Sequence, residues 1–399
     1  MAGIYLHIPF CRQACHYCNF HFSTSLRYKN EMIAALLTEI ELQAPIFPAR
    51  QEKPSLGQQV PGLFFQDKEL INNSGYLENE TIDTIYFGGG TPSLCTIYEI
   101  QSMMEKIYSS YVVSSHAEVT LEANPDDVDE DKLRGWREAG INRLSLGIQS
   151  FFEEDLNWMN RTHSASQATG SLRLAAGYFD NISIDLIYGT NLLTREKWKR
   201  NIDTAISYDL PHLSCYALTV EPKTPLHKMI RQHQTGDVDP GKQSEQFALL
   251  MQWLEKAGYE HYEISNFSKP GFRSRHNSSY WQGKKYLGIG PSAHSFNGKC
   301  RQWNISNNLQ YIAALNNMII PYEKEELTST QKLNERIMTS LRTMEGLKLE
   351  EIEKTASSRL LAASRKYIDS GKMKIENNSL ILTNEGKLLA DGIAAELFF

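Results

Sequence analysis

Short apolar segments alternate with amphipathic ones through the first half of the chain. Six segments rich in Ile, Val, Leu and Tyr have the length and composition of buried strands, and these are 4–8, 84–87, 119–122, 143–148, 182–187 and 212–218. The stretches between them, such as 28–42, 97–108 and 131–138, place apolar residues on one helical face. Strands that alternate with helices form βαβ units and a parallel sheet. Six units are too few for a closed eight-stranded barrel, so we predict an α/β fold built on an open, six-stranded partial barrel.

Two regions depart from this alternation. Residues 45–80 carry four prolines among many polar residues, which is typical of an inserted surface loop. From residue 301 onward, helix candidates surround a small β-hairpin that turns at Asn377-Asn378, and these candidates are 331–344, 349–355, 362–370 and 387–397. We therefore predict three parts: a partial-barrel core over 1–220, an extension over 221–300, and a smaller α+β, winged-helix-like module over 301–399.

The charge balance and the cysteine usage narrow the function. Lys and Arg number 41 against 47 Asp and Glu, and this mild acidity, without a basic stripe in the winged-helix-like module, argues against a nucleic-acid surface. We find neither a run of about 18 apolar residues for a membrane span nor the basic and apolar regions of a signal peptide. Cys95, Cys215 and Cys300 lie singly, which favours a reducing cytoplasm over disulfides.

Three further cysteines lie together near the start of the chain. Cys11, Cys15 and Cys18 have the spacing C-x3-C-x2-C, which fits one short loop around a cube of iron and sulfide. Three ligands leave one iron open, because Phe20 occupies the position where a fourth cysteine could lie. This spacing resembles that of radical S-adenosylmethionine (SAM) enzymes, whose open iron is chelated by the amino acid end of SAM. A zinc site with His16 or His21 as fourth ligand, or chance spacing, are the alternatives, but zinc usually takes paired cysteines with a distant second pair.

Polar motifs follow the predicted strands at the end where barrels of this kind place their chemistry. The cysteines follow the first strand, the run GGGTP (88–92) the second, Glu122 of EANP ends the third, and Gln149 follows the fourth. A glycine run alone normally means a turn, but next to an iron–sulfur loop it is a candidate for holding the methionine end of SAM. The Glu122 carboxylate could bind ribose hydroxyls or the ammonium group, or serve a structural role.

A carboxylate inside an apolar strand also needs an explanation. Asp185 lies in the segment ISIDLIYG, where burial requires a partner or a ligand. Arg161 could be that partner in a purely structural ion pair, or it could bind a ligand carboxylate with two hydrogen bonds.

The segment 274–296 gathers aromatic residues around a histidine. His276, Asn277, Tyr280 and Trp281 lie together there, with Tyr286 close behind. Imidazole ligates iron, and phenol and indole faces stack on flat macrocycles. A lone histidine would more often be structural, so the motif by itself is only suggestive.

Over essentially its whole length, the chain resembles the HemN/HemW branch of the radical SAM family. The shared motifs are HIPFC, the cysteine triad, FGGGTPS, EANP, RLSLGIQSF, MNRTH, IDLIYG, SCYALTVEPKTPL and YEISNF. The resemblance implies a partial (β/α)6 barrel with a HemN-type C-terminal domain, and a 4Fe–4S cluster on Cys11, Cys15 and Cys18. It also implies SAM bound around Tyr5, Gly89, Gly90, Thr91 and Glu122. The coproporphyrinogen oxidases of the branch bind a second SAM, at positions that match Gln149, Arg161, Asp185 and Ala217.

Three features resemble the heme chaperones of the branch rather than its oxidases. The oxidases typically have a fourth cysteine where this chain has Phe20, and usually an N-terminal extension ahead of the cluster. The third feature is the HNxxYW motif, which is associated with the chaperones and implies heme binding at His276, Asn277, Tyr280 and Trp281.

The resemblance implies a cytoplasmic carrier that binds heme and passes it to apoproteins such as respiratory enzymes. The cluster and SAM would support this transfer. Whether the protein forms a homodimer is left open by the sequence. The alternative is an oxygen-independent coproporphyrinogen III oxidase. In that enzyme the reduced cluster cleaves SAM, and the 5′-deoxyadenosyl radical abstracts hydrogen from a propionate, which loses carbon dioxide and an electron to become a vinyl group.

Overall fold

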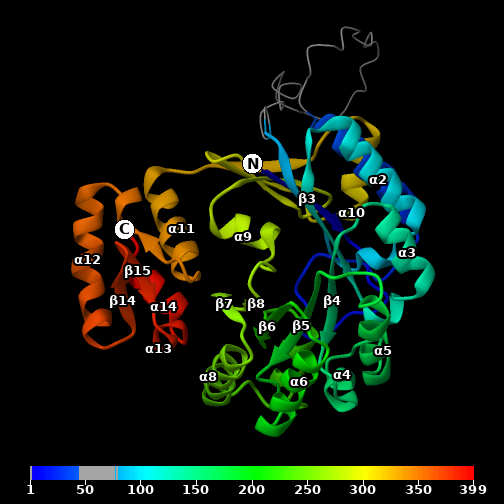
Figure 1. Ribbon diagram of the computed structural model, residues 1–399. Coiled ribbons are helices and arrows are strands. Elements are labelled where there is room, and N and C mark those ends of the chain that lie inside the picture. Colours follow the sequence, from blue (N-terminus) through cyan, green and yellow to red (C-terminus); the bar gives the residue numbers. More distant parts are fainter. Residues whose placement is uncertain (1, 45–76, 78–79) are drawn as a thin grey trace.

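The computed structural model describes residues 2–44, 77 and 80–399, so nearly all of the predicted insertion at 45–80 lies outside the described residues. Six parallel strands stand side by side in chain order and form a curved sheet (Figure 1). They are β1 (Ala2–Ile8), β2 (Ile82–Gly89), β3 (Val113–Ala123), β4 (Arg143–Gln149), β5 (Ile182–Tyr188) and β6 (His212–Ala217). The six predicted strands and their parallel order are confirmed.

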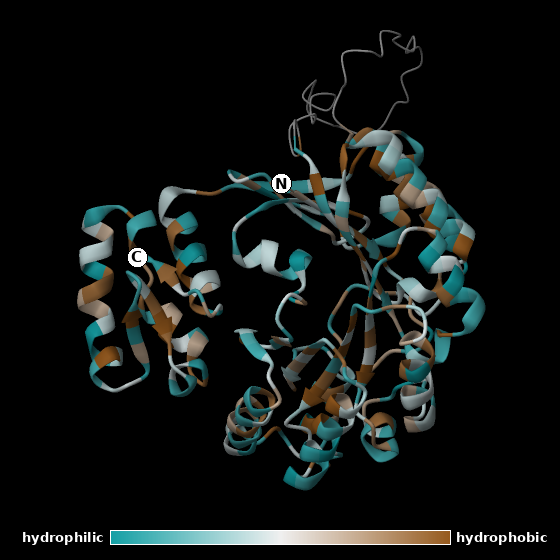
Figure 2. Ribbon diagram, viewed as in Figure 1, coloured by the Kyte–Doolittle hydropathy of each residue, from teal (hydrophilic) through white to brown (hydrophobic). Residues whose placement is uncertain are grey.

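Helices cover the outer face of this sheet (Figure 1). They are α1 (Lys29–Leu42), α2 (Ile97–Ser110), α3 (Glu130–Glu138), α4 (Glu153–Trp158), α5 (Ala165–Ala175), α6 (Arg195–Ser207) and α8 (Pro240–Lys256). The short helix α7 (Pro225–Arg231) lies instead beside the cysteine loop, where the Leu226 N–H donates to the His16 carbonyl over 2.8 Å. Capping boxes set where α2 and α5 begin, since Thr96 and Ser164 exchange side-chain and backbone hydrogen bonds with the third residue of each helix. Apolar residues fill the strands and the inward helix faces, where Trp136 and Trp198 are fully buried (Figure 2).

The sheet continues beyond the six predicted strands at both edges. At one edge, β9 (Lys285–Ile289) runs parallel to β1 and leads into antiparallel strands β10 (His294–Phe296), β11 (Cys300–Asn304) and β12 (Tyr322–Glu326). At the other edge, β8 (Asn266–Ser268) and β7 (Glu260–Glu263) continue from β6. In the described residues β12 and β7 do not pair, so the barrel stays open. The helix α9 (Arg275–Trp281) lies in this opening, and α10 (Asn308–Asn316) packs on α1 (Figure 1).

The C-terminal residues form a separate small domain with its own apolar core. Its elements are α11 (Ser329–Leu341), β13 (Leu347–Lys348), the 3-10 turn η3 (Leu349–Glu351), α12 (Lys354–Asp369), β14 (Met373–Glu376), β15 (Ser379–Leu382), α13 (Asn384–Lys387) and α14 (Ala390–Glu396). The predicted hairpin is confirmed: Asn377 and Asn378 both have positive φ, 48° and 57°, as a two-residue type I′ turn requires.

Two helix predictions in this domain are wrong in detail. Residues 349–355 form the 3-10 turn η3 and then the start of α12. A single turn is enough to bury Leu349, so this segment does not need a helix of its own. The predicted helix 387–397 contains only α14 and the last residue of α13, because the chain turns at Leu388–Leu389 between the two helices.

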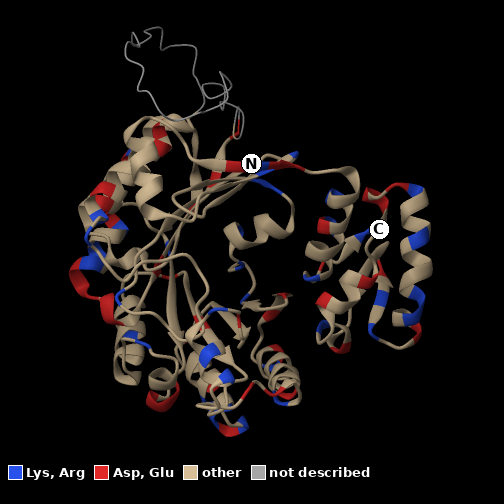
Figure 3. Cartoon of the chain, turned by 180° about the vertical axis from the view of Figure 1, so that it is seen from behind, with Lys and Arg blue, Asp and Glu red and all other residues tan. Residues whose placement is uncertain are grey.

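The outer surface carries mixed charge. Seen from behind, Lys and Arg are interspersed with Asp and Glu over the outer helices and the C-terminal domain (Figure 3). None of the described helices combines the length and the apolar character needed to cross a membrane.

Candidate functional site

A cavity of about 420 Å³ opens at the carboxyl ends of the parallel strands, and we call it the strand-end cavity. All three clustered cysteines line it, together with all but one of the residues predicted to hold SAM. These are Gly89, Gly90, Thr91, Glu122, Gln149, Arg161, Asp185 and Ala217. Segments spread over more than two hundred residues of sequence therefore meet at one place, as the parallel topology requires. The exposed Phe20 ring stands in its wall.

The cysteine loop is fixed by backbone bonds at its base and by the loop between α4 and α5. The Cys11 N–H donates to the Ser23 carbonyl over 3.0 Å. Asn160, with a positive φ of 58°, donates from its side chain to the Ala14 carbonyl over 2.7 Å and accepts from the Gln13 amide over 2.6 Å. The MNRTH motif thus supports the loop that carries the cysteines, although the two segments lie far apart in the sequence.

The donor set fits an iron–sulfur cluster better than zinc. Each thiolate of a cube binds a different iron, so the three sulfurs face one space without converging on a point. Within the described ranges no three His, Cys, Asp or Glu side chains converge on a single metal ion. Both histidines considered for zinc have other partners, because His16 Nδ1 donates to the Trp158 carbonyl over 2.8 Å and His21 Nε2 to the Asn308 side chain over 2.7 Å.

Two of the three thiols, those of Cys11 and Cys18, are protonated at neutral pH in the absence of metal. Burial raises the pKa of Cys11 to about 11, although the Thr91 hydroxyl, 3.5 Å from the sulfur, acts in the opposite direction. Burial also raises the pKa of Cys18. Only thiolates ligate iron well, so binding of an iron–sulfur cluster to this loop must release protons.

The glycine run allows the end of β2 to pass against the cysteine loop. Gly89 has a φ of +106°, and a Cβ there would lie 2.7 Å from the His7 ring. A Cβ on Gly90 would lie 2.5 Å from the Phe10 carbonyl oxygen. A side chain at Gly89 would therefore push against the His7 ring on β1, and one at Gly90 would push the end of β2 away from the start of the cysteine loop.

Two carboxyl groups give the strand-end cavity a charge that changes near neutral pH. Burial raises the pKa of Glu122 to about 7, while a hydrogen bond from the Tyr86 hydroxyl, 2.7 Å away, lowers it. Burial likewise raises the pKa of Asp185 to about 6. Carboxyl groups held in this state ionise readily when a cation or a hydrogen-bond donor binds beside them.

Arg161 joins the strand ends to the cysteine loop instead of pairing with Asp185. Its Nη2 donates to the Asn124 side chain over 2.7 Å and to the Gly147 carbonyl over 2.9 Å, and its Nη1 lies 3.4 Å from the Cys15 sulfur. Both Arg161 and Asp185 line the cavity without an ion pair between them. The lining residues that the sequence analysis missed include Tyr17, Ser145 and Tyr216, because a single aromatic or hydroxyl residue gives no signal outside a motif.

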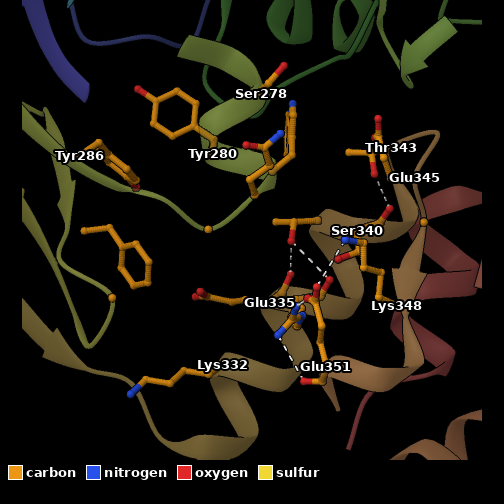
Figure 4. Close-up of a pocket in the computed structure, with 18 of the residues that line it drawn as sticks. Ser278, Tyr280, Tyr286, Lys332, Glu335, Ser340, Thr343, Glu345, Lys348 and Glu351 are labelled. Atoms are coloured by element: carbon orange, nitrogen blue, oxygen red, sulfur yellow. Dashed lines mark hydrogen bonds and ion pairs between the residues drawn. The ribbon is translucent and has the colours of Figure 1, made fainter. Parts of the chain in front are cut away.

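A second, larger cavity of about 850 Å³ lies between the barrel edge and the C-terminal domain, and we call it the edge cavity. Tyr280 on α9 and Tyr286 on β9 stand on one side of it, and Glu335 and Ser340 of α11 stand across from them (Figure 4). The Tyr280 and Tyr286 rings meet edge to face, with centroids 4.7 Å apart. Aromatic rings on one wall and charged groups on the other make this cavity amphipathic.

The HNxxYW motif is divided between the edge cavity and the barrel interior. Tyr280 and Trp281 line the edge cavity, whereas His276 and Asn277 do not. The His276 ring is buried: Nδ1 lies 2.8 Å from the Thr84 hydroxyl and Nε2 lies 2.9 Å from the Tyr280 hydroxyl. Burial, together with the Arg143 charge, lowers the pKa of His276 to about 3, so the ring is neutral.

A continuous set of packed side chains connects the two cavities. From the strand-end cavity, Glu122 bonds to Tyr86, whose ring stacks on His276 with centroids 4.9 Å apart. His276 in turn bonds to Tyr280 in the wall of the edge cavity. Tyr5, the predicted SAM residue that does not line the strand-end cavity, packs against Tyr86 and His276 instead.

Comparison with known proteins agrees with this geometry. Residues 5–205 match the model of the radical SAM superfamily, and residues 327–389 match that of the HemN C-terminal domain. The heme chaperone HemW of Mycobacterium tuberculosis is 31% identical over 405 residues, 99% of this chain and 94% of that protein. HemW of Bacillus subtilis is 29% identical over 401 residues, 98% of each chain.

A solved structure matches the whole fold. Coproporphyrinogen III oxidase (HemN) of Escherichia coli superimposes with a TM-score of 0.79 at 21% identity, over 100% of this chain and 90% of that one. Members of the radical SAM superfamily carry a 4Fe–4S cluster and SAM, for which the strand-end cavity offers three thiols and a polar, glycine-walled space. This chain belongs to the radical SAM superfamily, in its HemN/HemW branch.

Proposed function

We propose that the protein is a heme carrier that takes up heme in the edge cavity and releases it to apo-hemoproteins such as respiratory enzymes. The observation that carries this proposal is the composition of the cavity around the HNxxYW segment. Its aromatic side chains, Tyr280, Trp281, Tyr286 and Phe296, suit a flat macrocycle. Its volume, about 850 Å³, lies in the range of sites that enclose a large organic ligand.

Basic side chains in the same cavity suit the two propionates of heme. Among the lining residues five are Lys or Arg and three are Glu, so the wall has a net positive charge. Arg guanidinium groups bind carboxylates with two parallel hydrogen bonds. A ligand with an apolar face and an anionic edge therefore matches both walls, and the HemW relatives are named as heme chaperones.

We assign the strand-end cavity to the cluster and to SAM. Cys11, Cys15 and Cys18 would hold the cluster, which with SAM bound supplies one-electron chemistry. Gly89 and Gly90 keep the backbone close to the thiols, and Glu122 would accept a hydrogen bond from the ribose or the ammonium group of SAM. The free thiols of this loop need reducing conditions, which supports a cytoplasmic location.

The test is heme transfer by the reconstituted protein. The protein is loaded with one equivalent of heme under anaerobic conditions, and an apo-form of a b-type cytochrome is added. We expect the absorbance of the loaded protein to be replaced by that of the holo-cytochrome, faster than spontaneous loss of heme to an equal concentration of apo-myoglobin. Failure to bind heme, or equal rates to both acceptors, would contradict the proposal.

A second candidate, coproporphyrinogen III oxidase, is favoured by one observation. Gln149, Arg161, Asp185 and Ala217, which match the second-SAM positions of the oxidases, line the strand-end cavity with the cysteines. Anaerobic turnover of coproporphyrinogen III, with SAM and a strong reductant, separates the two functions. Protoporphyrinogen formation by protein with a full cluster would establish the oxidase, and its absence alongside heme transfer would establish the carrier.

A further inference from the structure

We propose that His294 is the axial ligand of the heme iron in the edge cavity, in preference to His276 of the HNxxYW motif. This proposal rests on the proposed function, because it requires that heme binds in that cavity. It assigns the iron to a strand residue that belongs to no recognised motif of this chain. Three independent observations carry it: the direction of the side chain, its free ring nitrogens, and the groups that surround it.

The strand register places His294 on the cavity face of the sheet. His294 and Phe296 are two residues apart on β10, so their side chains leave the same face, while Ser295 between them is buried on the other face. On β11, Trp303 pairs with His294 and Arg301 pairs with Phe296. His294, Phe296 and Arg301 all line the edge cavity.

The His294 ring is free to bind a metal, whereas the His276 ring is not. His294 is exposed, and neither of its ring nitrogens has a hydrogen-bond partner among the described residues. Of the residues that the structure describes, it is also the only histidine that lines the edge cavity. Both nitrogens of His276 are already bonded to hydroxyl groups, so ligation by that ring would break a buried hydrogen bond and require α9 to move.

The charged groups near His294 leave its ring unobstructed. Glu335, a carboxylate that lines the same cavity, is paired with Arg301 over 3.0 Å and not with the imidazole.

Two buried donors in the same cavity have no partner. Neither Trp281 Nε1–H nor Arg301 Nε–H forms a hydrogen bond within the described part of the chain. Buried donors left unpaired are unfavourable, and a carboxylate ligand would satisfy them. The macrocycle would then lie against Phe296 and Tyr286, with its iron at His294 and its propionates toward Arg301 and Trp281.

The test is an anaerobic titration of full-length protein with ferric heme, followed by absorption and electron paramagnetic resonance spectroscopy. His294→Gln and His294→Ala are compared with the unchanged protein and with His116→Gln, a change at an exposed histidine on β3 that lines neither cavity. We expect both His294 variants to lose the imidazole-ligand spectrum and to bind heme about tenfold or more weakly, equivalent to roughly 1.4 kcal/mol. The His116 variant should be unchanged, and added imidazole should restore the spectrum of His294→Ala.

Iron-free protoporphyrin IX and heme dimethyl ester separate the contributions within the site. The iron-free macrocycle should bind His294→Gln as well as it binds the unchanged protein, and the ester should bind more weakly to all variants because it lacks both carboxylates. If the unchanged protein binds no heme, the proposed function fails. If it binds heme and the His294 variants keep both the affinity and the spectrum, only the assignment of His294 fails.

Discussion

The two cavities of this protein are built in different ways. The walls of the strand-end cavity come from the ends of neighbouring parallel strands, and much of the wall is backbone, as at Gly89 and Gly90. The walls of the edge cavity come from several separate parts of the chain: α9, the strands β9, β10 and β11, residues Tyr262 and Arg273, and α11 with the segment 343–351 that follows it. One cavity is a property of a single sheet, and the other depends on how a second domain packs against that sheet.

This difference matches two different tasks. A resident cofactor needs a fixed site, and backbone groups locked in a parallel sheet supply one. A carried ligand must enter and leave, which is easier where one wall belongs to another domain. The C-terminal domain is attached beside the edge cavity by a few bonds, such as Arg342 to Glu263 over 3.0 Å and Arg273 to Glu345 over 2.7 Å.

The largest expected effect is the loss of the cluster without the loss of heme binding. Cys15→Ala removes one of the three thiols, so iron and sulfide contents after reconstitution should fall nearly to zero. Because the edge cavity does not include this loop, the heme affinity should stay within about twofold, which is less than 0.5 kcal/mol. Cys300→Ala, a change outside the loop, is the control and should keep the cluster. Unchanged iron and sulfide in Cys15→Ala would disprove the cluster site.

A change at Gly90 should weaken SAM binding strongly. In Gly90→Ala the new methyl group would meet the Phe10 carbonyl at 2.5 Å, so β2 and the cysteine loop must separate. Overpacking of this kind costs about 1–3 kcal/mol, which corresponds to a loss of roughly five- to 150-fold in affinity if the cost falls on the SAM-bound form. Calorimetric titration with SAM measures the effect. Gly170→Ala, on α5 with open space around it, is the matched control, and equal affinities in the two variants would contradict this account.

The affinity for SAM should depend on pH, and the affinity for heme much less. Burial raises the pKa of Glu122 to about 7, so the carboxylate is present above that pH and the neutral acid below it. If SAM binds the carboxylate, its affinity rises as the pH approaches 7 from below, by up to about tenfold per unit, and levels off above about pH 8. Glu122→Gln should bind SAM weakly and without this slope; a slope that persists in the variant would show that another group is responsible.

The same pKa shift predicts a change in stability. Because the folded protein holds the Glu122 proton more tightly than the unfolded chain, this group lowers the free energy of unfolding as pH rises from about 4.5 to about 7. Glu122→Gln removes the titrating carboxyl group, and with it this decrease in the free energy of unfolding. The free energy of unfolding, measured by chemical unfolding, should therefore fall less between pH 5 and pH 8 in the variant than in the unchanged protein. Equal changes in the two proteins would contradict the shift in the Glu122 pKa.

The smallest expected effect concerns the connection between the cavities. Tyr280→Phe keeps the ring in the edge cavity but removes the hydroxyl that bonds to His276 Nε2 over 2.9 Å. The unpaired nitrogen should lower the free energy of unfolding by about 1–3 kcal/mol, with only a few-fold loss of heme affinity. Tyr286→Phe keeps the aromatic wall and loses a hydroxyl that has no part in this connection, so its free energy of unfolding should stay close to that of the unchanged protein. Equal losses of stability in the two variants would contradict a role for the hydroxyl bond.

The strand-end cavity could be predicted from the sequence because each of its motifs follows a strand. Once strands alternate with helices, the parallel topology places Cys11, Gly89, Glu122 and Gln149 at one end without any further information. Tyr5, for which SAM binding stays a prediction, lies behind the cavity wall, because it sits in the middle of β1 and not at its end.

The edge cavity could not be predicted in the same way. The sequence identified the aromatic residues of the HNxxYW segment but not the direction of each side chain, so His276 and Tyr280 were treated alike although they face different spaces. The antiparallel strands β10 and β11 are short and were not predicted, and without them His294 and Arg301 are isolated residues. The contact with α11 depends on the packing of two domains, which local patterns do not encode.

The most direct test of the two-cavity account is a heme titration of reconstituted protein in the presence of saturating SAM. If the cavities are separate, each chain should bind one heme with an affinity within about threefold of that measured without SAM, since the ligands do not overlap. If heme and SAM exclude one another, so that saturating SAM prevents heme binding, both ligands share the strand-end cavity and the account is wrong.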